Sequence, residues 1–484
     1  MRLSELFEGI AYRHATDSNR CCAHLEITDV IISPETGCEN ALFVAVNTGL
    51  CNTRYQMSAA FARGCRVFLC EYDAAPGEGA TVLIAKDVEK LLGLLAARVF
   101  GHPSRYMSVI GVTGSTGKSS VISLAAHALQ KAGLRVATLG SDGFCLQGKH
   151  TSPTPIVPDA AGIQRMLATM KDAGAEVVLL ELSSYQLSHF AANGIDFFGV
   201  LLTNLTPRHI GGKEHASFAE YRAAKEELMR AKAAFAILPA DVEMQTHPCA
   251  LRVGEGGEIY CEGVSEGVLS KGIPYTRIIL AQKEEKYEIT LPVVGDIAKD
   301  SVLYAFALCR ALGLLGSEIA ASLCACRIPC RIELVAHRAE KLVYLDAAFL
   351  PQDLANALQA LRPLAKGRLC VLLGSVGGRA KERRAPLAQT AGRCADLVYL
   401  TADDPDLENP EAICLEMRAA MQEPERARVV PDREAAIRLA VSELRRGDVL
   451  LVIAKPVPHT QLVCGIRRPF MDAALIKSAL RDGE

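Results

Sequence analysis

Short runs of consecutive apolar residues recur along the chain, and the segments between them carry apolar residues at every third or fourth position. The runs predict buried strands, and the longer period predicts helices with one apolar face. Regular alternation of the two predicts an α/β fold with parallel sheets. The predicted strands are 41–46, 66–70, 108–113, 176–181, 199–203, 341–345, 368–373, 396–401 and 448–453.

The same pattern divides the chain into three parts. Residues 1–100 combine two strands with a helix predicted over 55–63 and form a small α/β module. Residues 101–328 alternate strands and helices as in a doubly wound parallel sheet, with further strand material over 281–294. Residues 329–484 form a third α/β unit. A chain of 484 residues can hold three domains, because domains commonly have about 150 residues.

Composition favours a large cytoplasmic enzyme. The net charge is −2 and the pI is about 6.6, so neither nucleic acid nor an anionic membrane is an expected partner. No uninterrupted apolar run reaches the ~20 residues of a membrane span. Glu5 stands where a signal peptide would be apolar. We therefore expect a cytoplasmic protein.

The cysteines are expected to be reduced and buried. Their number, 17, is odd, and they lie in apolar segments. The densest group is Cys324, Cys326 and Cys330, which could hold a metal ion. Zinc sites usually need a second pair of ligands, and none is evident, so a metal at this group is the less favoured interpretation.

The most specific chemical signal follows the strand that ends near residue 113. The segment consists of Gly114, Ser115, Thr116, Gly117, Lys118, Ser119 and Ser120, with two residues between its glycines. A helix is predicted after it, over 121–132. A strand, a glycine turn and a helix N-terminus together predict a phosphate-binding loop. Lys118 would reach the β- and γ-phosphates and Ser119 would hold Mg²⁺. A plain turn with a surface lysine is the alternative.

Polar residues follow the neighbouring strands. Glu181 ends one apolar strand, at the sheet edge where a second Mg²⁺ ligand is needed. The next strand leads into 203–206, which reads Thr-Asn-Leu-Thr, and then to His209. Tyr221 and Lys225 follow with a spacing that places both on one face of a helix. Taken alone, Lys225 would be interpreted as an exposed helix lysine.

This order of motifs resembles the Mur ligase family, the ATP-dependent amino-acid-adding enzymes of peptidoglycan precursor synthesis. Within the family, it is most similar to the tripeptide synthetases, which add the third amino acid of the stem peptide. Further matching segments are Thr-Ser-Pro at 151–153, Gly-Ser-Val-Gly-Gly-Arg at 374–379 and Thr-Ala-Asp-Asp-Pro at 401–405. The resemblance implies three domains: a UDP-sugar-binding-like module, a central ATPase domain on a P-loop parallel sheet, and a C-terminal Rossmann-like ligase domain.

The resemblance also implies a reaction and its participants. ATP phosphorylates a substrate carboxylate, and the amine of an incoming amino acid attacks the acyl phosphate. The implied substrates are UDP-N-acetylmuramoyl-alanyl-glutamate and an amino acid, with ATP and Mg²⁺, and the implied state is a monomer. Two alternatives stay open. One is a ligase of this fold that acts on another carboxylate, and the other is a non-catalytic nucleotide-binding paralogue.

The family pattern assigns roles to individual residues. The implied catalytic residues are Lys118, His209 and Lys225, and the implied metal ligands are Ser119, Glu181, His209 and Lys225, with Lys225 carbamylated by CO₂. The implied nucleotide contacts are Gly114, Ser115, Thr116, Gly117, Lys118, Ser119, Ser120, Arg331 and Asp346. The implied substrate contacts are Thr151, Ser152, Ser183, Arg379, Asp403, Asp404 and Asp406.

Asp406 determines which amino acid we expect as the incoming substrate. In relatives that add diaminopimelate, the acidic loop ends in an arginine that pairs with the distal carboxylate. Asp406 would repel that carboxylate and attract an ammonium instead, which favours a lysine-like amino acid. A solvated Asp-Pro turn is the alternative interpretation of this loop.

Several positions depart from the family pattern. Arg208 replaces an acid, and Phe349 stands in a segment that has lost the family tyrosine and histidine. Ala298 and Ser301 replace two asparagines on the adenine side of the nucleotide. The segment 454–459 lacks the glutamate that holds the incoming amino group. The phosphate half of the site therefore resembles the family more closely than the substrate half does.

Overall fold

The computed structural model describes most of the chain. The residues outside the description are 17, 20–21, 36–38, 48–51, 141–142, 147, 152–158, 208–214, 245–247, 249, 269–273, 294–295, 325, 329, 379–380, 455–459 and 483–484. The described chain forms two compact units. The first comprises residues 1–118 and 132–253, and the second comprises residues 119–131 and 254–484.

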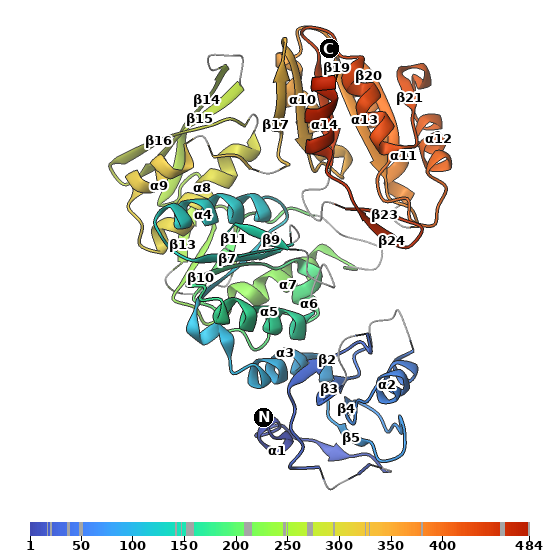
Figure 1. Ribbon diagram of the computed structural model, residues 1–484. Helices are drawn as coiled ribbons and strands as arrows, with labels where there is room; N and C mark the ends of the chain where they lie inside the picture. Colours follow the sequence, from blue (N-terminus) through green and yellow to red (C-terminus); the bar gives the residue numbers. More distant parts are fainter. Residues whose placement is uncertain are drawn as a thin grey trace. The chain divides into compact units, whose positions relative to one another are not determined.

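The first unit begins with a five-stranded sheet in the order β1-β5-β4-β3-β2 (Figure 1). Its strands are β1 (Arg13–His14), β2 (Asp29–Ile31), β3 (Ala41–Val44), β4 (Val67–Cys70) and β5 (Thr81–Ile84). β1 is antiparallel and the others are parallel. α1 (Leu3–Leu6) and α3 (Val88–Val99) cover one face, and α2 (Thr53–Ala62) covers the other. Burial on both faces explains why these strands are continuously apolar.

The second sheet of this unit carries the phosphate-binding motif and has the order β13-β12-β11-β6-β10-β7-β8-β9. Its strands are β6 (Ser108–Thr113), β7 (Val136–Gly140), β8 (Gly143–Leu146), β9 (Lys149–Thr151), β10 (Val177–Glu181), β11 (Gly199–Leu202), β12 (Phe235–Pro239) and β13 (Ala250–Val253). The β7–β8 and β8–β9 pairs are antiparallel, so only β8 runs against the direction of the other strands. One core contains side chains of these strands and of α5 (Ala160–Asp172), α6 (Ser184–Ser188) and α7 (Phe218–Met229). A short 3₁₀ helix, η1 (Pro103–Tyr106), precedes β6.

The second unit contains an antiparallel meander of β14 (Ile259–Val268), β15 (Pro274–Gln282) and β16 (Glu285–Leu291). Three helices belong to the same unit: α4 (Lys118–Lys131), α8 (Asp296–Ala311) and α9 (Gly316–Leu323). The first residue of α4, Lys118, is the one exception, because it belongs to the first unit. The predicted strand material over 281–294 is present as the end of β15 and the whole of β16, and a turn at Lys283, with φ of +55°, separates the two strands.

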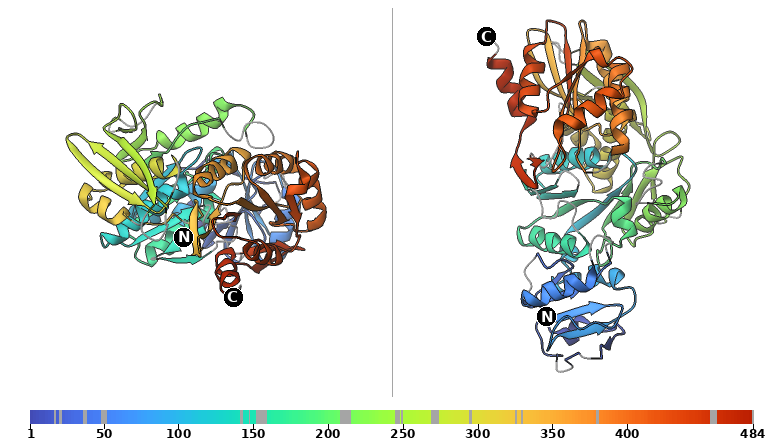
Figure 2. Two further views of the ribbon diagram at one scale, coloured as in Figure 1. Left: turned by 90° about the horizontal axis from the view of Figure 1, so that it is seen from above. Right: turned by 90° about the vertical axis from the view of Figure 1, so that its right-hand side faces the viewer.

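The C-terminal sheet has the order β17-β18-β22-β19-β20-β21, with only β17 antiparallel. Its strands are β17 (Glu333–Arg338), β18 (Lys341–Asp346), β19 (Leu369–Ser375), β20 (Leu397–Ala402), β21 (Ala427–Val429) and β22 (Val449–Ile453). α10 (Pro351–Leu361), α11 (Arg384–Cys394) and α12 (Pro410–Ala419) pack on one face, while α13 (Arg433–Ser442) and α14 (Asp472–Asp482) pack on the other (Figure 2). A hairpin of β23 (Thr460–Val463) and β24 (Ile466–Pro469) and the 3₁₀ helices η2 (Arg362–Leu364), η3 (Lys381–Arg383) and η4 (Pro424–Arg426) complete the unit.

The predicted α/β class, the central P-loop parallel sheet and the C-terminal Rossmann-like sheet are confirmed. The strand over 108–113 has the predicted bounds, whereas the helix predicted from residue 121 begins at Lys118. It starts earlier because the loop leads directly into the first helical turn. The domain boundaries at residues 100 and 328 stay predictions. Among the described residues, no helix is both long and apolar enough to cross a membrane.

Candidate active site

The phosphate-binding loop lies at the carboxyl end of β6, between Thr113 and the start of α4 at Lys118. Two glycines give it its shape. Gly114 has φ of +149° and Gly117 has φ of +80°, both in the region that side chains disfavour. A Cβ on Gly114 would lie 1.9 Å from the Thr203 hydroxyl oxygen. Only glycine therefore allows β11 to approach the loop so closely.

Gly114→Ala is expected to weaken ATP binding by about tenfold or more, because strain of this kind costs of order 1–3 kcal/mol. Titration calorimetry with a non-hydrolysable ATP analogue would measure the affinity. Gly133→Ala is the matched control, since Gly133 has φ of +90° but open space where its Cβ would lie. Equal ATP affinity in the two variants would contradict the steric explanation.

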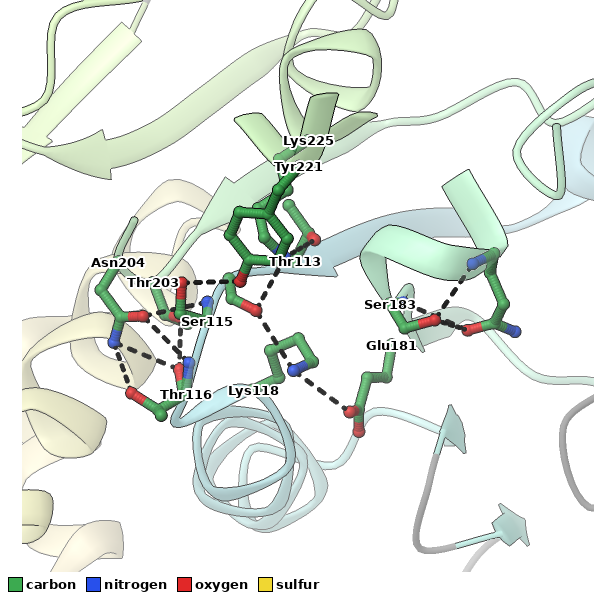
Figure 3. Close-up of polar contacts among 12 residues, drawn as sticks. Thr113, Ser115, Thr116, Lys118, Glu181, Ser183, Thr203, Asn204, Tyr221 and Lys225 are labelled. Carbon is green, nitrogen blue, oxygen red and sulfur yellow. Dashed lines mark hydrogen bonds and ion pairs between the residues drawn. The ribbon is translucent and has the colours of Figure 1, made fainter. Parts of the chain in front are cut away.

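The end of β11 holds the loop in place. The Asn204 side-chain oxygen accepts the N–H groups of Ser115 (3.0 Å) and Thr116 (2.9 Å), and its amide donates to the Thr116 hydroxyl at 2.8 Å (Figure 3). The Thr203 hydroxyl donates to the Thr116 carbonyl at 2.6 Å. No site role was predicted for Asn204 or Thr203. The polar end of an apolar strand was the available signal.

A buried tyrosine connects the loop to α7. The Tyr221 hydroxyl donates to the Ser115 hydroxyl oxygen at 2.7 Å. The Ser115 hydroxyl in turn donates to the Thr206 carbonyl at 2.9 Å and accepts the Thr206 N–H at 2.9 Å. Ser115 is thus fully hydrogen-bonded within the protein, so its side chain shapes the loop.

Lys118 lies inside the loop, as predicted. Its ammonium donates to the Gly114 carbonyl at 3.2 Å and lies 3.8 Å from a carboxylate oxygen of Glu181, at the end of β10. A Cβ on Gly140 would lie 2.7 Å from the Glu181 carboxylate, so glycine at that position leaves room for the acid. The structure therefore brings the predicted phosphate-binding lysine and the predicted metal-binding acid together.

Lys225 is buried, with 1% of its surface exposed, and is not the exposed helix lysine of the alternative interpretation. Its ammonium donates to the Gly114 carbonyl at 2.9 Å and to the Thr113 hydroxyl oxygen at 3.3 Å, and it lies 4.7 Å from the Tyr221 ring centre. The ammonium groups of Lys225 and Lys118 thus share one carbonyl oxygen (Figure 3). Burial, reinforced by the positive charge of Lys118, lowers the Lys225 pKa to about 7, although Glu181 opposes the shift.

The structure also describes four other predicted site residues of this part of the chain: Ser119, Ser120, Thr151 and Ser183. Ser183 caps α6, and its hydroxyl accepts the Gln186 N–H at 3.1 Å. Ser119 and Ser120 lie in the first turn of α4, where the buried Ser120 hydroxyl has no hydrogen-bond partner among the described residues. Thr151 ends β9. Three predicted site residues lie outside the described residues: Ser152, His209 and Arg379.

The candidates in the second unit form two groups. Asp346 ends β18 and is 2% exposed, and it accepts the Ile332 N–H at 2.8 Å. Burial raises its pKa to about 6, while the nearby Arg331 charge opposes that shift. Arg331 and Asp346 are therefore neighbours, and the Asp346 carboxylate is turned into the protein.

The second group is the acidic loop after β20. Asp404 accepts the Leu462 N–H at 2.8 Å, and Asp406 accepts the Gly465 N–H at 2.9 Å through its side chain. The Asp406 backbone also donates to the Leu462 carbonyl at 3.1 Å, with φ of +52°. Both carboxylates thus fasten the β23–β24 hairpin to the loop. The solvated-turn interpretation does not fit Asp404, which is buried.

The cysteines behave as predicted where they are described. Thirteen cysteines are described, and most of these are buried. Among the described residues, no group of three or more His, Cys, Asp or Glu side chains could hold a metal ion. This applies to the described cysteines of the 324–330 segment as well.

Comparison with known proteins identifies the family. Residues 112–309 match the Mur ligase middle domain, and residues 330–455 match the Mur ligase glutamate ligase domain. A UDP-N-acetylmuramoyl-L-alanyl-D-glutamate--2,6-diaminopimelate ligase of Ectopseudomonas mendocina is 30% identical over 91% of this chain and 92% of its own length. A ligase of the same name from Chromobacterium violaceum is 31% identical over 82% of both chains.

Solved structures share the fold. A structure of a UDP-N-acetylmuramoyl-L-alanyl-D-glutamate--2,6-diaminopimelate ligase superimposes with a TM-score of 0.66 and 21% identity over 100% of this chain and 99% of that one. A Mycobacterium tuberculosis folylpolyglutamate synthase complexed with ADP and AMPPCP gives a TM-score of 0.58 and 19% identity over 74% of this chain and 91% of that one. Together with the loop, lysines and acid described above, these matches show that the chain belongs to the Mur ligase family and is an ATP-dependent, ADP-forming amino-acid ligase.

Proposed function

We propose that this ligase joins the amine of an amino acid to the carboxylate of a UDP-linked muramoyl dipeptide in peptidoglycan precursor synthesis. The carboxylate takes the γ-phosphoryl group of ATP with release of ADP. The amine then attacks the acyl carbon, and phosphate leaves as the amide forms. The observation that carries the proposal is the buried Lys225 beside Lys118 and Glu181, because a merely structural lysine gains little from such burial.

The loop can neutralise the charges that meet in this reaction. A substrate carboxylate and a γ-phosphate repel each other, so phosphoryl transfer needs fixed positive charge around both. Lys118 supplies one such charge at the loop. The loop N–H groups and the N-terminus of α4 add partial positive charge for the phosphates. We assign Gly114 to Ser120 to nucleotide binding on this basis.

Mg²⁺ fits the donor atoms of the site. Magnesium ions at nucleotide sites use one or two protein oxygens and otherwise bind phosphates and water. Glu181 and Ser119 offer such oxygens, and His209 is proposed as a further ligand. When bound, Mg²⁺ would offset phosphate charge during transfer. As an ammonium, Lys225 cannot bind a metal ion, so its proposed role requires a carbamate.

The depressed pKa suits Lys225 for that modification. A pKa of about 7 leaves a substantial neutral fraction at neutral pH, and only the neutral amine reacts with CO₂. Carbamylation replaces a cation by an anion with two oxygens. The new charge would lie beside the Lys118 ammonium, which then favours the modified form.

The relatives' names suggest UDP-N-acetylmuramoyl-L-alanyl-D-glutamate as the carboxylate substrate. They also suggest diaminopimelate as the amine. We propose a lysine-like amine instead, because Asp406 places negative charge where diaminopimelate-adding relatives have arginine. One Asp406 oxygen accepts the Gly465 N–H, so recognition of an ammonium would fall to the other oxygen.

Asp406→Asn separates these two uses of the carboxylate. Asparagine tolerates a positive φ and its side-chain oxygen can still accept the Gly465 N–H, but it carries no charge. We expect KM for lysine to rise about tenfold, which corresponds to loss of one charge-assisted contact. Asp406→Arg should shift the preference toward diaminopimelate. An unchanged lysine KM in Asp406→Asn would mean that Asp406 only fastens the hairpin.

Phosphate release from MgATP tests the proposed function. The protein would receive UDP-N-acetylmuramoyl-alanyl-glutamate with lysine, ornithine or diaminopimelate in separate reactions. Release that requires both substrates, with the peptide product identified by mass spectrometry, would support the proposal. ATP binding without release for any amine would count against it.

A second candidate is a ligase of this family that acts on another carboxylate. In the sequence, residues 47–54 lack the acidic pattern that follows the uridine-binding strand in the family. The segment 454–459 lacks the family glutamate that holds the incoming amino group. Phosphate release with carboxylates that lack a UDP group would favour this candidate.

A further inference from the structure

Two loops of the C-terminal sheet are in direct contact. The glycine loop, residues 376–378, follows β19, and the acidic loop, residues 403–408, follows β20. The Gly377 N–H donates to the Asp404 carbonyl at 2.7 Å. A Cβ on Gly377 would lie 1.8 Å from the Pro405 carbonyl oxygen, so the two backbones touch. Both loops lie at the carboxyl edge of the sheet, where ligands bind in folds of this class.

Arg384, the first residue of α11, links these two loops. Its side chain is fully buried. Its two terminal nitrogens donate to the two Glu408 oxygens at 2.9 Å and 2.8 Å, as a fork facing a carboxylate. One nitrogen also donates to the Val376 carbonyl at 3.1 Å, and the other to Glu416 at 2.6 Å. A single guanidinium thus contacts the glycine loop, the acidic loop and α12.

Glu408 completes the connection. The Glu408 oxygen that accepts from Arg384 at 2.8 Å also accepts the Gly378 N–H at 2.9 Å, and Lys381 lies 3.4 Å from the oxygen that accepts from Arg384 at 2.9 Å. The Arg384 hydrogen bonds, followed by the Gly378 N–H, lower the pKa of Glu408 to about 2. Glu408 therefore stays ionised, and its ion pair with Arg384 persists, over the whole pH range in which the protein would work.

Stability alone does not account for this arrangement. A buried ion pair is often replaced by apolar side chains without loss of stability, because its desolvation is costly. The Nε of Arg384 is buried and has no hydrogen-bond partner among the described residues. Three directional contacts to two loops instead fix where those loops lie.

We propose that Arg384 is a positioning residue for the incoming amine: it holds the glycine loop and the acidic loop in the register that binds the amino acid. This rests on the proposed function, in which the acidic loop receives the amine. Arg384 touches no substrate itself. A lysine at position 384 would keep the positive charge but could not make the paired hydrogen bonds to both Glu408 oxygens. A methionine at this position would keep the approximate volume without the charge.

The test compares Arg384→Lys and Arg384→Met with Arg393→Met, an exposed arginine on the same helix. We expect Arg384→Met to raise KM for the amino acid about 10- to 100-fold, because small displacements of positioning groups cost this much. KM for ATP should stay within about twofold, and Arg384→Lys should recover part of the loss. Arg393→Met should match the wild type. An equal rise in both KM values, or none, would overturn the proposal.

Hydrogen exchange provides a readout that does not depend on ligase activity. Removal of the fork should speed exchange of the Gly377 and Gly378 amides in Arg384→Met without accelerating exchange in β19. The double variant Arg384→Met/Glu408→Gln also removes the Glu408 charge that loses its arginine partner, and it serves if the single variant folds poorly. Unchanged exchange at both amides would overturn the proposal even if the enzyme is active. Faster exchange in a protein that ligates no amine would instead count against the proposed function.

Discussion

Lys118→Ala is expected to lower the rate of ATP-dependent ligation by about 10³-fold or more, because fixed cationic groups at a transferring phosphoryl group contribute on this scale. In the structure the ammonium reaches both the Gly114 carbonyl and the Glu181 carboxylate, inside the loop. ATP binding should weaken less than the rate, since the loop N–H groups remain. Single-turnover phosphate release and titration calorimetry would measure the two effects.

Lys131→Ala is the matched control, because Lys131 is an exposed lysine at the far end of the same helix. It should leave both quantities unchanged. If the Lys118→Ala protein still ligates at more than a tenth of the wild-type rate, Lys118 does not take part in the chemical step.

Lys225→Met is expected to lower the ligation rate strongly while making the protein more stable at neutral pH. The buried ammonium is unfavourable, as the depressed pKa of about 7 indicates, and methionine fills similar space without charge. Activity should fall by about 10²-fold or more if the carbamate has the proposed role. A ¹³C-labelled carbamate signal in bicarbonate should appear in the wild type and be absent from the variant.

The stability difference should depend on pH in a defined direction. Lys225 has a pKa of about 7 when folded and 10.5 as its ordinary value, so the unfolded chain binds the extra proton between these values. Wild-type stability therefore rises with pH from about 7 to 10.5, and the folded state is penalised most below pH 7. The advantage of Lys225→Met, on the order of a few kcal/mol, should shrink across this window.

Urea unfolding at pH 6.5 and pH 9.5 would measure the difference. Lys232→Met, at an exposed lysine just beyond α7, should show no such pH dependence. If Lys225→Met is as stable relative to the wild type at both pH values, the amine is not held neutral by burial.

Local patterns predicted much of this protein. Strand, glycine turn and helix N-terminus are adjacent in the chain around Gly114, so their geometry depends on residues within a few positions of one another. The apolar runs predicted the strands for the same reason, since burial on both faces leaves a continuous apolar signature. The turn between β15 and β16 was not predicted as such, although residues 282–286 are all polar.

Contacts between distant segments could not be predicted in this way. Lys225 lies in a helix segment rich in charged residues, and only the packing of α7 against β6 buries its ammonium. Asn204 and Tyr221 act on the loop across 88 and 106 positions of the chain, respectively. The carboxylate of Asp406 was expected to face a ligand, yet one of its oxygens holds the hairpin turn.

The sequence by itself determined the fold class, the phosphate-binding loop and the lysine and acid that serve it, because these follow from short-range periodicity and motif chemistry. Only the tertiary structure decided the protonation preference of Lys225 and the partners of Asp406 and Arg384. A pKa depends on desolvation and on charges brought close by folding, and a side chain's partner depends on which strands end at the same sheet edge.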